Sequence, residues 1–354
     1  MNKLLTVIIP IYNTDKYLER CIGSCVHPEV NIVAIDDGST DNSLNTLECL
    51  QRKYSSIEIL HGNHQGAVHA RRVGLAHVNT KYFSFVDSDD KVRIKPYMQL
   101  CRDLDMHNIK VGNGRMTVYL PGINIPFTSR KWKKDIVDFL KDKKEFSNTT
   151  CSFLDKIFHY DTIPLLDRDS KQTVYEDMEF VYYVLAKNKS MLHSNSSIYE
   201  YHMRGIEGNS TSAIGLNMDY SNGVRGLLSA GDSMVRKFQN AGIYEEFQPE
   251  LEAIMIKLFF QRLHNVFFSS TIENKEEMAY HMIDILNSYL PGWQNNPYYR
   301  EHFQGSEYND YLFYLSSSMN LKLNKIDESY QTGTDTNTLL EQYDKKIKLH
   351  IKSS

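Results

Sequence analysis

Three aspartates lie within four residues of one another, directly after an apolar run. Tyr82–Val86 has the length and the aromatic composition of a strand, and Asp87, Asp89 and Asp90 follow it. Carboxylates crowded at the end of a strand repel one another, so a positive group is expected among them. A hard divalent cation, which takes oxygen ligands, fits this pattern. A solvated acidic turn ahead of a helix is the alternative.

A second apolar run, Asn31–Ile35, also ends in acids, Asp36 and Asp37. In open α/β sheets, ligands bind beyond the carboxyl ends of the strands, where Asp36 or Asp37 could accept hydrogen bonds from a base or a ribose. No Gly-x-Gly-x-x-Gly motif follows the first strand and no Gly-Lys-Ser/Thr loop is present, which argues against a dehydrogenase and a P-loop phosphotransferase. If the ligand is a nucleotide, its phosphates must be held in another way, and a metal ion bound to Asp89 would serve.

Strands and helices alternate on the way to these acids. This order predicts a doubly wound, mostly parallel sheet with helices on its faces. The expected strands are Leu4–Ile9, Asn31–Ile35, Ile57–Leu60 and Lys81–Val86, and the expected helices are Lys16–Val26, Asn42–Tyr54 and Gly66–Ala76.

The middle of the chain continues the mixed pattern. Val111–Leu120 is expected to be a strand, and the alternation over Ile198–Arg204 predicts an edge strand. Arg130–Phe146 has an apolar stripe at helical spacing among many lysines, which predicts an amphipathic helix. This helix either packs on the sheet with a solvated face, the interpretation we favour, or touches anionic lipid headgroups.

Glu176 and Asp177 open a further expected helix, whose apolar face includes Phe180 and Val184. Acids in a first helical turn are favoured by the helix dipole alone, so their position by itself does not indicate catalysis.

From about Asn217 the pattern is helical. We therefore expect a mixed domain at residues 1–215 and a helical domain at residues 216–354. The expected helices are Val224–Gln239, Tyr244–Ser269, Lys275–Leu290 and Thr336–His350.

Composition excludes several classes of protein. The 354 residues are 41% hydrophobic and 24% charged with a net charge of -4, so nothing points to nucleic acid. The five cysteines match no zinc or redox spacing and fit a reducing cytosol. No stretch of about 18 apolar residues predicts a transmembrane helix.

Four segments in sequence order resemble the family 2 glycosyltransferases of GT-A fold: Val7–Asn13, Asp36–Asp41, Gly66–Gly74 and Asp87–Asp90. The resemblance implies a nucleotide-diphosphate sugar as donor and Mn²⁺ or Mg²⁺ as cofactor. One departure is that the Ala-Arg-Asn usual in the family reads Ala70-Arg71-Arg72 here.

The resemblance also implies roles for single residues. Asp87-Ser88-Asp89 matches the family's Asp-x-Asp motif, with Asp87 near the ribose and metal and Asp89 on the metal. Asp177 matches the general base, and Lys156 lies where the family has an Asn-Lys pair. Residues expected near the donor are Pro10, Tyr12, Asn13, Asp36, Asp37, Gly66, Arg71, Asp87, Ser88 and Arg204, and His202 is expected as a further metal ligand.

The expected protein is therefore an inverting, metal-dependent transferase, inversion being implied by the family alone. Its acceptor would be a hydroxyl of a glycan or a lipid-linked glycan in bacterial surface polysaccharide synthesis. We expect a cytoplasmic protein and leave open peripheral membrane contact and homo-oligomers. The alternatives are a sugar-1-phosphate nucleotidyltransferase, which normally has a Gly-rich basic loop after its first strand, and a non-catalytic nucleotide-sugar-binding module.

Overall fold

The computed structural model describes residues 3–119, 127–129, 131–166, 175–202, 220–268 and 275–299. The chain divides into two compact units. One holds Met1–Lys143 and Thr150–Glu207, and the other holds Lys144–Thr149 and Gly208–Ser354.

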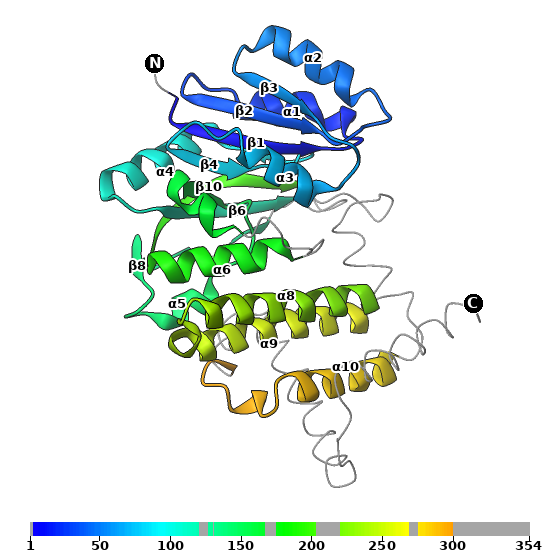
Figure 1. Ribbon diagram of the computed structural model, residues 1–354, viewed down its shortest axis with the longest axis vertical. Helices are drawn as coiled ribbons and strands as arrows, with labels where there is room; N and C mark the ends of the chain where they lie inside the picture. The colour runs from blue at the N-terminus through cyan, green and yellow to red at the C-terminus, as the bar shows by residue number, and fades with distance from the viewer. Residues whose placement is uncertain are drawn as a thin grey trace, which may run out of the picture. The chain divides into compact units, whose positions relative to one another are not determined.

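The first unit is built on a mixed sheet, which contains ten strands in the described residues (Figure 1). Its strands are β1 (Leu5–Ile11), β2 (Val30–Asp36), β3 (Ile57–His61), β4 (Tyr82–Phe85), β5 (Lys91–Val92), β6 (Val111–Tyr119), β7 (Phe127–Thr128), β8 (Ile136–Asp138), β9 (Lys156–His159) and β10 (Ser190–His202). Its helices are α1 (Asp15–Cys25), α2 (Ser43–Lys53), α3 (Ala67–Leu75), α4 (Ile94–His107), the 3₁₀ turn η1 (Tyr160–Leu165) and α6 (Glu176–Asn188).

The main path of the sheet runs β3-β2-β1-β4-β9-β6-β10-β5. The first four strands of this path, β3, β2, β1 and β4, are parallel, as their alternation with helices predicts. Beyond β4 the sheet is mixed, because β9 is antiparallel to both of its neighbours while β6 and β10 are parallel. The predicted α/β class with helices flanking the sheet is confirmed, and the parallel pairing is concentrated in its N-terminal half.

The prediction of an edge strand at Ile198–Arg204 is wrong in position. β10 pairs with β6 on one side and with β5 and β8 on the other, and Ile198 and Tyr199 are fully buried. Alternating polarity reports that one face of a strand is solvated, and this also occurs in strands that are paired on both sides.

The two faces of β1 pack against different helices, because successive side chains of a strand point to opposite sides. Val7 and Ile9 belong to the same core cluster as Leu18 and Cys21 of α1. On the opposite face, Ile8 lies against Gly74 of α3. All seven residues of β1 are buried, as its continuous apolar run predicts.

The predicted helix at Arg130–Phe146 is wrong. Over the described part of this range, β8 pairs antiparallel with β10, a turn follows, and only Lys143–Asn148 (α5) is helical. Val137 and Phe139 are buried, whereas Ile136 and Leu140 are exposed, so burial follows a period of two. The apolar residues fit both periods, and the available partner strand decides between them. An interfacial helix is therefore excluded here.

The second unit is helical. Its helices are α8 (Tyr220–Asn240), α9 (Tyr244–Phe268) and α10 (Lys275–Tyr289), followed by the 3₁₀ turn η2 (Trp293–Asn295). α9 packs against both α8 and α10. Three of the four predicted helices are thereby confirmed, and the fourth, Thr336–His350, lies outside the described residues.

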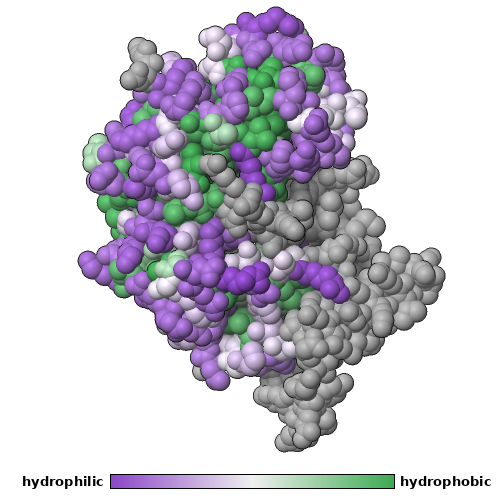
Figure 2. Space-filling model, viewed as in Figure 1, coloured by the Kyte–Doolittle hydropathy of each residue, from purple (hydrophilic) through white to green (hydrophobic). Residues whose placement is uncertain are grey.

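Hydrophilic residues cover much of the face shown in Figure 2, with hydrophobic residues visible between them. Among the described helices, none combines the length and the apolar character that crossing a membrane requires.

The close packing of α3 on β1 can be tested at Gly74. A Cβ there would lie 2.5 Å from Cγ2 of Ile8, a stiff β-branched side chain. We expect Gly74→Ala to lower the free energy of unfolding by roughly 1 kcal/mol, because overpacking costs more than the gain in helix propensity. Urea denaturation measures this change.

Gly23 of α1 is the matched control, because a Cβ there meets nothing within 4 Å. Gly23→Ala should raise stability by about 0.5–1 kcal/mol. Equal gains in both variants would contradict the close approach of α3 to the sheet.

Candidate active site

Parallel pairing brings the predicted residues to one edge of the sheet. Ile11 is in register with Asp36, and Asp36 is in register with His61. The pairing of β1 with β4 ends at Ile8 and Phe85, shortly before the aspartates. Pro10 is buried in β1 beyond this last pair. The loops that follow β1, β2, β3 and β4 therefore leave the sheet at the same edge.

Asn13 and Asp37, two of the residues predicted to lie near the nucleotide-sugar, connect these loops by accepting hydrogen bonds. Oδ1 of Asn13 accepts hydrogen bonds from the backbone of Thr40 (2.8 Å) and Asp41 (3.3 Å). The carboxylate of Asp37 accepts from the backbone of Gln65 (3.0 Å) and Gly66 (2.6 Å). Asn13 and Asp37 thus fix the loops that follow the strands. Gly66, with φ 90°, lets the backbone turn into α3.

Asp36 differs from Asp37 because one of its carboxylate oxygens accepts no hydrogen bond from the described residues. It is 4% exposed, and Oδ2 accepts a bond from the backbone of Ser39 at 3.3 Å. Oδ1 is buried without a hydrogen-bond partner among the described residues. Burying such an acceptor unpaired costs about 1–3 kcal/mol, so this oxygen is suited to an N–H or O–H group of a ligand.

An aromatic pair stands at the same edge. Tyr12, which is 40% exposed, packs against His64 with ring centroids 4.2 Å apart. Sequence analysis missed His64. Its position just after β3, at the carboxyl edge of the parallel strands, is the signal that could have identified it.

Asp90 fixes the acidic turn after β4. It is fully buried and accepts hydrogen bonds from the hydroxyl of Tyr199 (2.8 Å) and the backbone of His202 (2.7 Å). Burial, and then the charges of Asp87 and Asp89, raise the pKa of Asp90 to about 8. The same Tyr199 oxygen accepts a bond from the backbone of Asp87 at 3.1 Å.

Asp89 and Ser88 are the other members of the turn. Asp89 is part-buried, and its backbone oxygen accepts a hydrogen bond from Arg20 of α1. Ser88 is 5% exposed. Sequence analysis missed Arg20 and Tyr199, because neither lies in a motif and both act on the turn from distant elements.

His202 ends β10 beside this turn. Its ring stacks on Tyr119 with centroids 4.6 Å apart, and Nε2 is buried without a hydrogen-bond partner among the described residues. Burial, and then the charge of Arg20, lower the pKa of His202, which favours the neutral form that binds metals. The predicted donor residue Arg204 lies outside the described residues.

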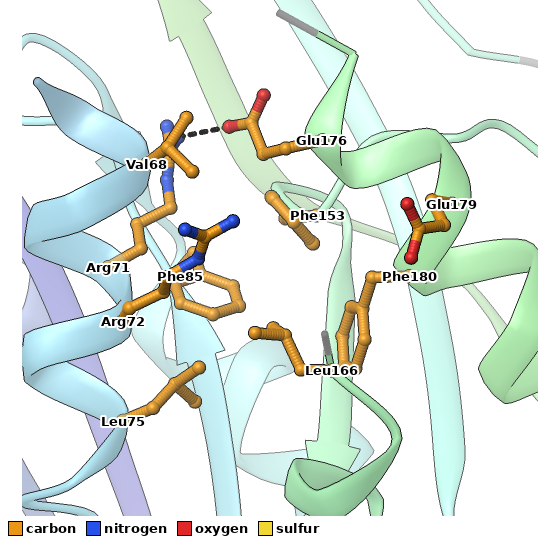
Figure 3. A pocket seen from close by; sticks show the side chains of 10 residues that line it. All are labelled: Val68, Arg71, Arg72, Leu75, Phe85, Phe153, Leu166, Glu176, Glu179 and Phe180. Atoms are coloured by element: carbon orange, nitrogen blue, oxygen red, sulfur yellow. Dashed lines mark hydrogen bonds and ion pairs between the residues drawn. The ribbon is translucent and has the colours of Figure 1, made fainter. Parts of the chain in front are cut away.

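A guanidinium joins the acidic turn to the start of α6, and Figure 3 shows its contact with Glu176 of that helix. Arg71 of α3 forms ion pairs with Oδ1 of Asp87 at 2.8 Å and Oε1 of Glu176 at 2.7 Å. Its side chain is 14% exposed and lies over the ring of Phe153. Arg71 therefore brings the Asp-x-Asp segment and the Glu176-Asp177 pair into one site.

Asp177 lies part-buried in the first turn of α6. Burial, and then the charge of Glu176, raise its pKa to about 7, while the charges of Arg71 and Lys156 act against the rise. A carboxylate with a pKa near neutrality is suited to accept a proton at physiological pH.

Lys156 is a structural residue. It is fully buried, and its ammonium donates to Asp155 (2.7 Å), Thr150 (2.8 Å) and the backbone oxygen of Ser152 (2.9 Å). These three acceptors use all of its donors, so Lys156 orders the segment before β9 and contributes a positive charge near Asp177.

A divalent cation would find only part of its ligands in the protein. The described residues contain no group of three or more His, Cys, Asp or Glu that could hold a metal. Mg²⁺ usually keeps several waters and binds one or two carboxylates together with substrate phosphates. Asp87 and Asp89 could supply the carboxylates of such a partial set, whereas the structure does not gather His202 with them into a group of three. Tight metal binding is therefore expected to need further ligands from a substrate.

The N-terminal part of the chain matches a known family of proteins. The family model Glycosyl transferase family 2 matches residues 6–153. Glycosyltransferase GlyG of Streptococcus pneumoniae is 33% identical over 120 residues, covering 32% of this chain and 40% of that protein. Teichoic acid poly(glycerol phosphate) polymerase of Staphylococcus epidermidis is 34% identical over 97 residues, covering 26% of this chain and 13% of that protein. The matches thus span less than half the length of these relatives.

Among solved structures, the chain is similar to TarS 1-349 of S. aureus in complex with UDP-GlcNAc. The TM-score is 0.59 at 19% identity, and the alignment covers 81% of this chain and 82% of that one. This likeness shows that the two share the GT-A fold.

The two ion pairs of Arg71 can be tested without an assay of enzyme activity. Arg71→Met should lower the free energy of unfolding by roughly 2–4 kcal/mol, because it leaves two part-buried carboxylates unpaired. It should also raise the pKa of Asp177 above its present value, because a nearby positive charge is lost. Urea denaturation and a carboxyl NMR titration measure the two effects.

Arg102→Met is the control, because the pair of Arg102 with Glu29 is exposed at 45% and 30%. Its stability should change by no more than about 1 kcal/mol. An unchanged Asp177 titration in Arg71→Met would contradict the shared site.

Proposed function

Residues 6–153 belong to the family 2 glycosyltransferases, and we propose that the chain transfers a sugar from a UDP-sugar to a hydroxyl group of a glycan. The observation that carries this proposal is the double ion pair of Arg71, which joins Asp87 of the Asp-x-Asp segment to Glu176 beside Asp177. Asp87 and Glu176 pair with different nitrogens of one guanidinium, Nη2 and Nη1. This favours a donor site and a proton acceptor that lie close together.

The nucleoside binds at the edge formed by β1, β2 and β3. Tyr12, backed by His64, offers an exposed ring for stacking on the base. The unpaired oxygen of Asp36 accepts a hydrogen bond from the base or the ribose. TarS, which shares the fold, has been solved with UDP-GlcNAc, and this favours a uridine nucleotide as donor.

Asp87 and Asp89 would hold Mn²⁺ or Mg²⁺ against the diphosphate. Such a cation neutralises charge on the leaving nucleotide and fixes its orientation. Arg71 lies beside Asp87 and adds a fixed positive charge to the same region.

Asp177 removes the proton from the acceptor hydroxyl as that oxygen attacks the anomeric carbon. Attack from the face opposite the diphosphate inverts the configuration at that carbon. Glu176 holds Arg71 in place, and the raised pKa of Asp177 makes its carboxylate a stronger base than an exposed aspartate.

The acceptor is proposed to be a cell-surface glycan or its lipid-linked precursor, made on the cytoplasmic side of the membrane. A teichoic acid polymerase is among the relatives of the N-terminal region, which favours a polymer of this kind.

The role of Asp177 predicts a separation of binding from transfer. Asp177→Asn should bind UDP-sugar with unchanged affinity and lose about 10²–10⁴-fold in transfer rate. In the wild type, kcat/KM should fall tenfold per pH unit below about pH 7, because the base becomes protonated. Release of UDP from a panel of UDP-sugars with a glycan acceptor measures both effects.

Asp161→Asn is the matched control, because Asp161 is a 53% exposed acid that pairs with Lys110. It should transfer at the wild-type rate. Near-normal turnover by Asp177→Asn would rule out Asp177 as the base.

The metal role of Asp89 predicts a loss of metal-dependent nucleotide binding. Wild-type protein should bind UDP at least tenfold more tightly with Mn²⁺ than with EDTA, and Asp89→Asn should abolish most of that difference. Calorimetry measures the affinities, with Asp103→Asn of α4 as a control. Equal UDP affinity of the wild type with Mn²⁺ and with EDTA would refute the proposed metal site.

A further inference from the structure

The helical unit contains a cavity that the proposed transfer reaction does not use. It has a volume of about 240 Å³ and is lined by residues of α8, α9 and α10. These helices lie side by side in Figure 1. A cavity of this volume can hold several waters or one small polar ring, and it is smaller than a site for a drug-sized ligand.

One wall of the cavity is held in place by short contacts. The hydroxyl of Tyr289 donates a hydrogen bond to Asp232 at 2.9 Å. Burial, and then the charge of Asp232, raise the pKa of Tyr289, so the hydroxyl keeps its proton and remains a donor. Gly231 allows this position, because a Cβ there would lie 2.7 Å from the Tyr289 hydroxyl.

A second acid is held in a similar way. Glu252 accepts hydrogen bonds from Gln248 (2.8 Å) and Asn296 (3.3 Å). Both carboxylates of the lining are therefore oriented by neighbours, and each keeps capacity to accept further bonds, because a carboxylate has about four acceptor sites.

Two other polar groups of the lining are available to a ligand. Arg236 is exposed and forms no hydrogen bond or ion pair with any described residue. The hydroxyl of Tyr244, which is part-buried, likewise has no hydrogen-bond partner in the described part of the chain. The lining thus offers unpaired donors, from Arg236 and Tyr244, as well as the oriented acceptors of Asp232 and Glu252.

The charges select against an anionic ligand. Asp232 and Glu252 outnumber Arg236, so the lining carries a net negative charge and disfavours phosphates and acidic lipids. A neutral polyol fits better, because each sugar hydroxyl both donates and accepts hydrogen bonds. Leu251, Met255 and the tyrosine rings supply apolar surface for the C–H face of a pyranose.

We propose that this cavity binds one neutral sugar unit of a glycan, as a carbohydrate subsite of the helical unit. The proposal rests on the proposed function in one respect: the bound sugar belongs to the acceptor or the product of the transfer reaction. The subsite holds the glycan during repeated transfers and lowers KM for a long acceptor.

Binding can be measured without any turnover. Saturation-transfer NMR with glucose, galactose and N-acetylglucosamine at millimolar concentration should show binding to the full chain in the presence of saturating UDP and Mn²⁺. For a sugar that binds the wild type, Arg236→Ala should lower the affinity about tenfold, and Tyr244→Phe should lower it several-fold. Arg225→Ala, an arginine of α8 outside the cavity lining, should bind like the wild type.

Kinetics gives a second readout. Arg236→Ala should raise KM for a polymeric glycan acceptor and leave kcat and the KM for UDP-sugar unchanged. A thermal melt equal to that of the wild type shows that each variant is folded.

Three results would overturn the subsite. They are the absence of sugar binding to the wild type, equal binding by wild type and Arg236→Ala, and binding of inorganic phosphate in place of sugar. Failure of UDP release with every donor would instead refute the proposed transferase activity, and the NMR result would still decide the subsite.

Discussion

The candidate active site depends on one cation placed between carboxylates. Asp87 and Glu176 come from segments far apart in sequence, and without Arg71 their negative charges would repel one another. Removing charges from water is costly, so a part-buried acid is stable only with a partner or with a raised pKa. Asp87 and Glu176 have the partner. Asp177, beside them without an ion pair in the described residues, has the raised pKa. The structure thereby separates acids that position the site from the acid suited to accept a proton.

The same residue type serves different purposes at neighbouring strand ends. Asp37 and Asp90 accept bonds from backbone N–H groups and fix the loops after β2 and β4. Asp36 and Asp89 each precede one of these residues by one position, and Oδ1 of Asp36 has no hydrogen-bond partner in the described residues. Successive residues at a strand end point in different directions, so one acid of each adjacent pair holds the loop and the other is the one proposed to contact the ligand.

The two units differ in how much of their chemistry a motif can reveal. The acids of the first unit lie in short segments, because loops at the carboxyl edge of a parallel sheet gather residues that are close in sequence. The cavity of the helical unit is lined by α8, α9 and α10, so its polar residues are spread along the chain from Asp232 to Tyr289. Such a site leaves no compact signature in the sequence.

The resemblance of four motifs to a known family indicated the GT-A class. The sequence alone determined the alternation of strands and helices and the acids at the strand ends. Those features are local, since hydrophobic period and strand length are legible within a few residues. It could not decide that Val137–Asp138 pairs with β10 as a strand, because the apolar residues of that segment fit both periods and the partner strand lies about fifty residues away. It could not distinguish the loop-holding role of Asp37 from the unpaired oxygen of Asp36, nor find Arg20, His64 and Tyr199. Hydrogen bonds and burial between distant segments decide those roles, and such contacts exist only once the chain has folded.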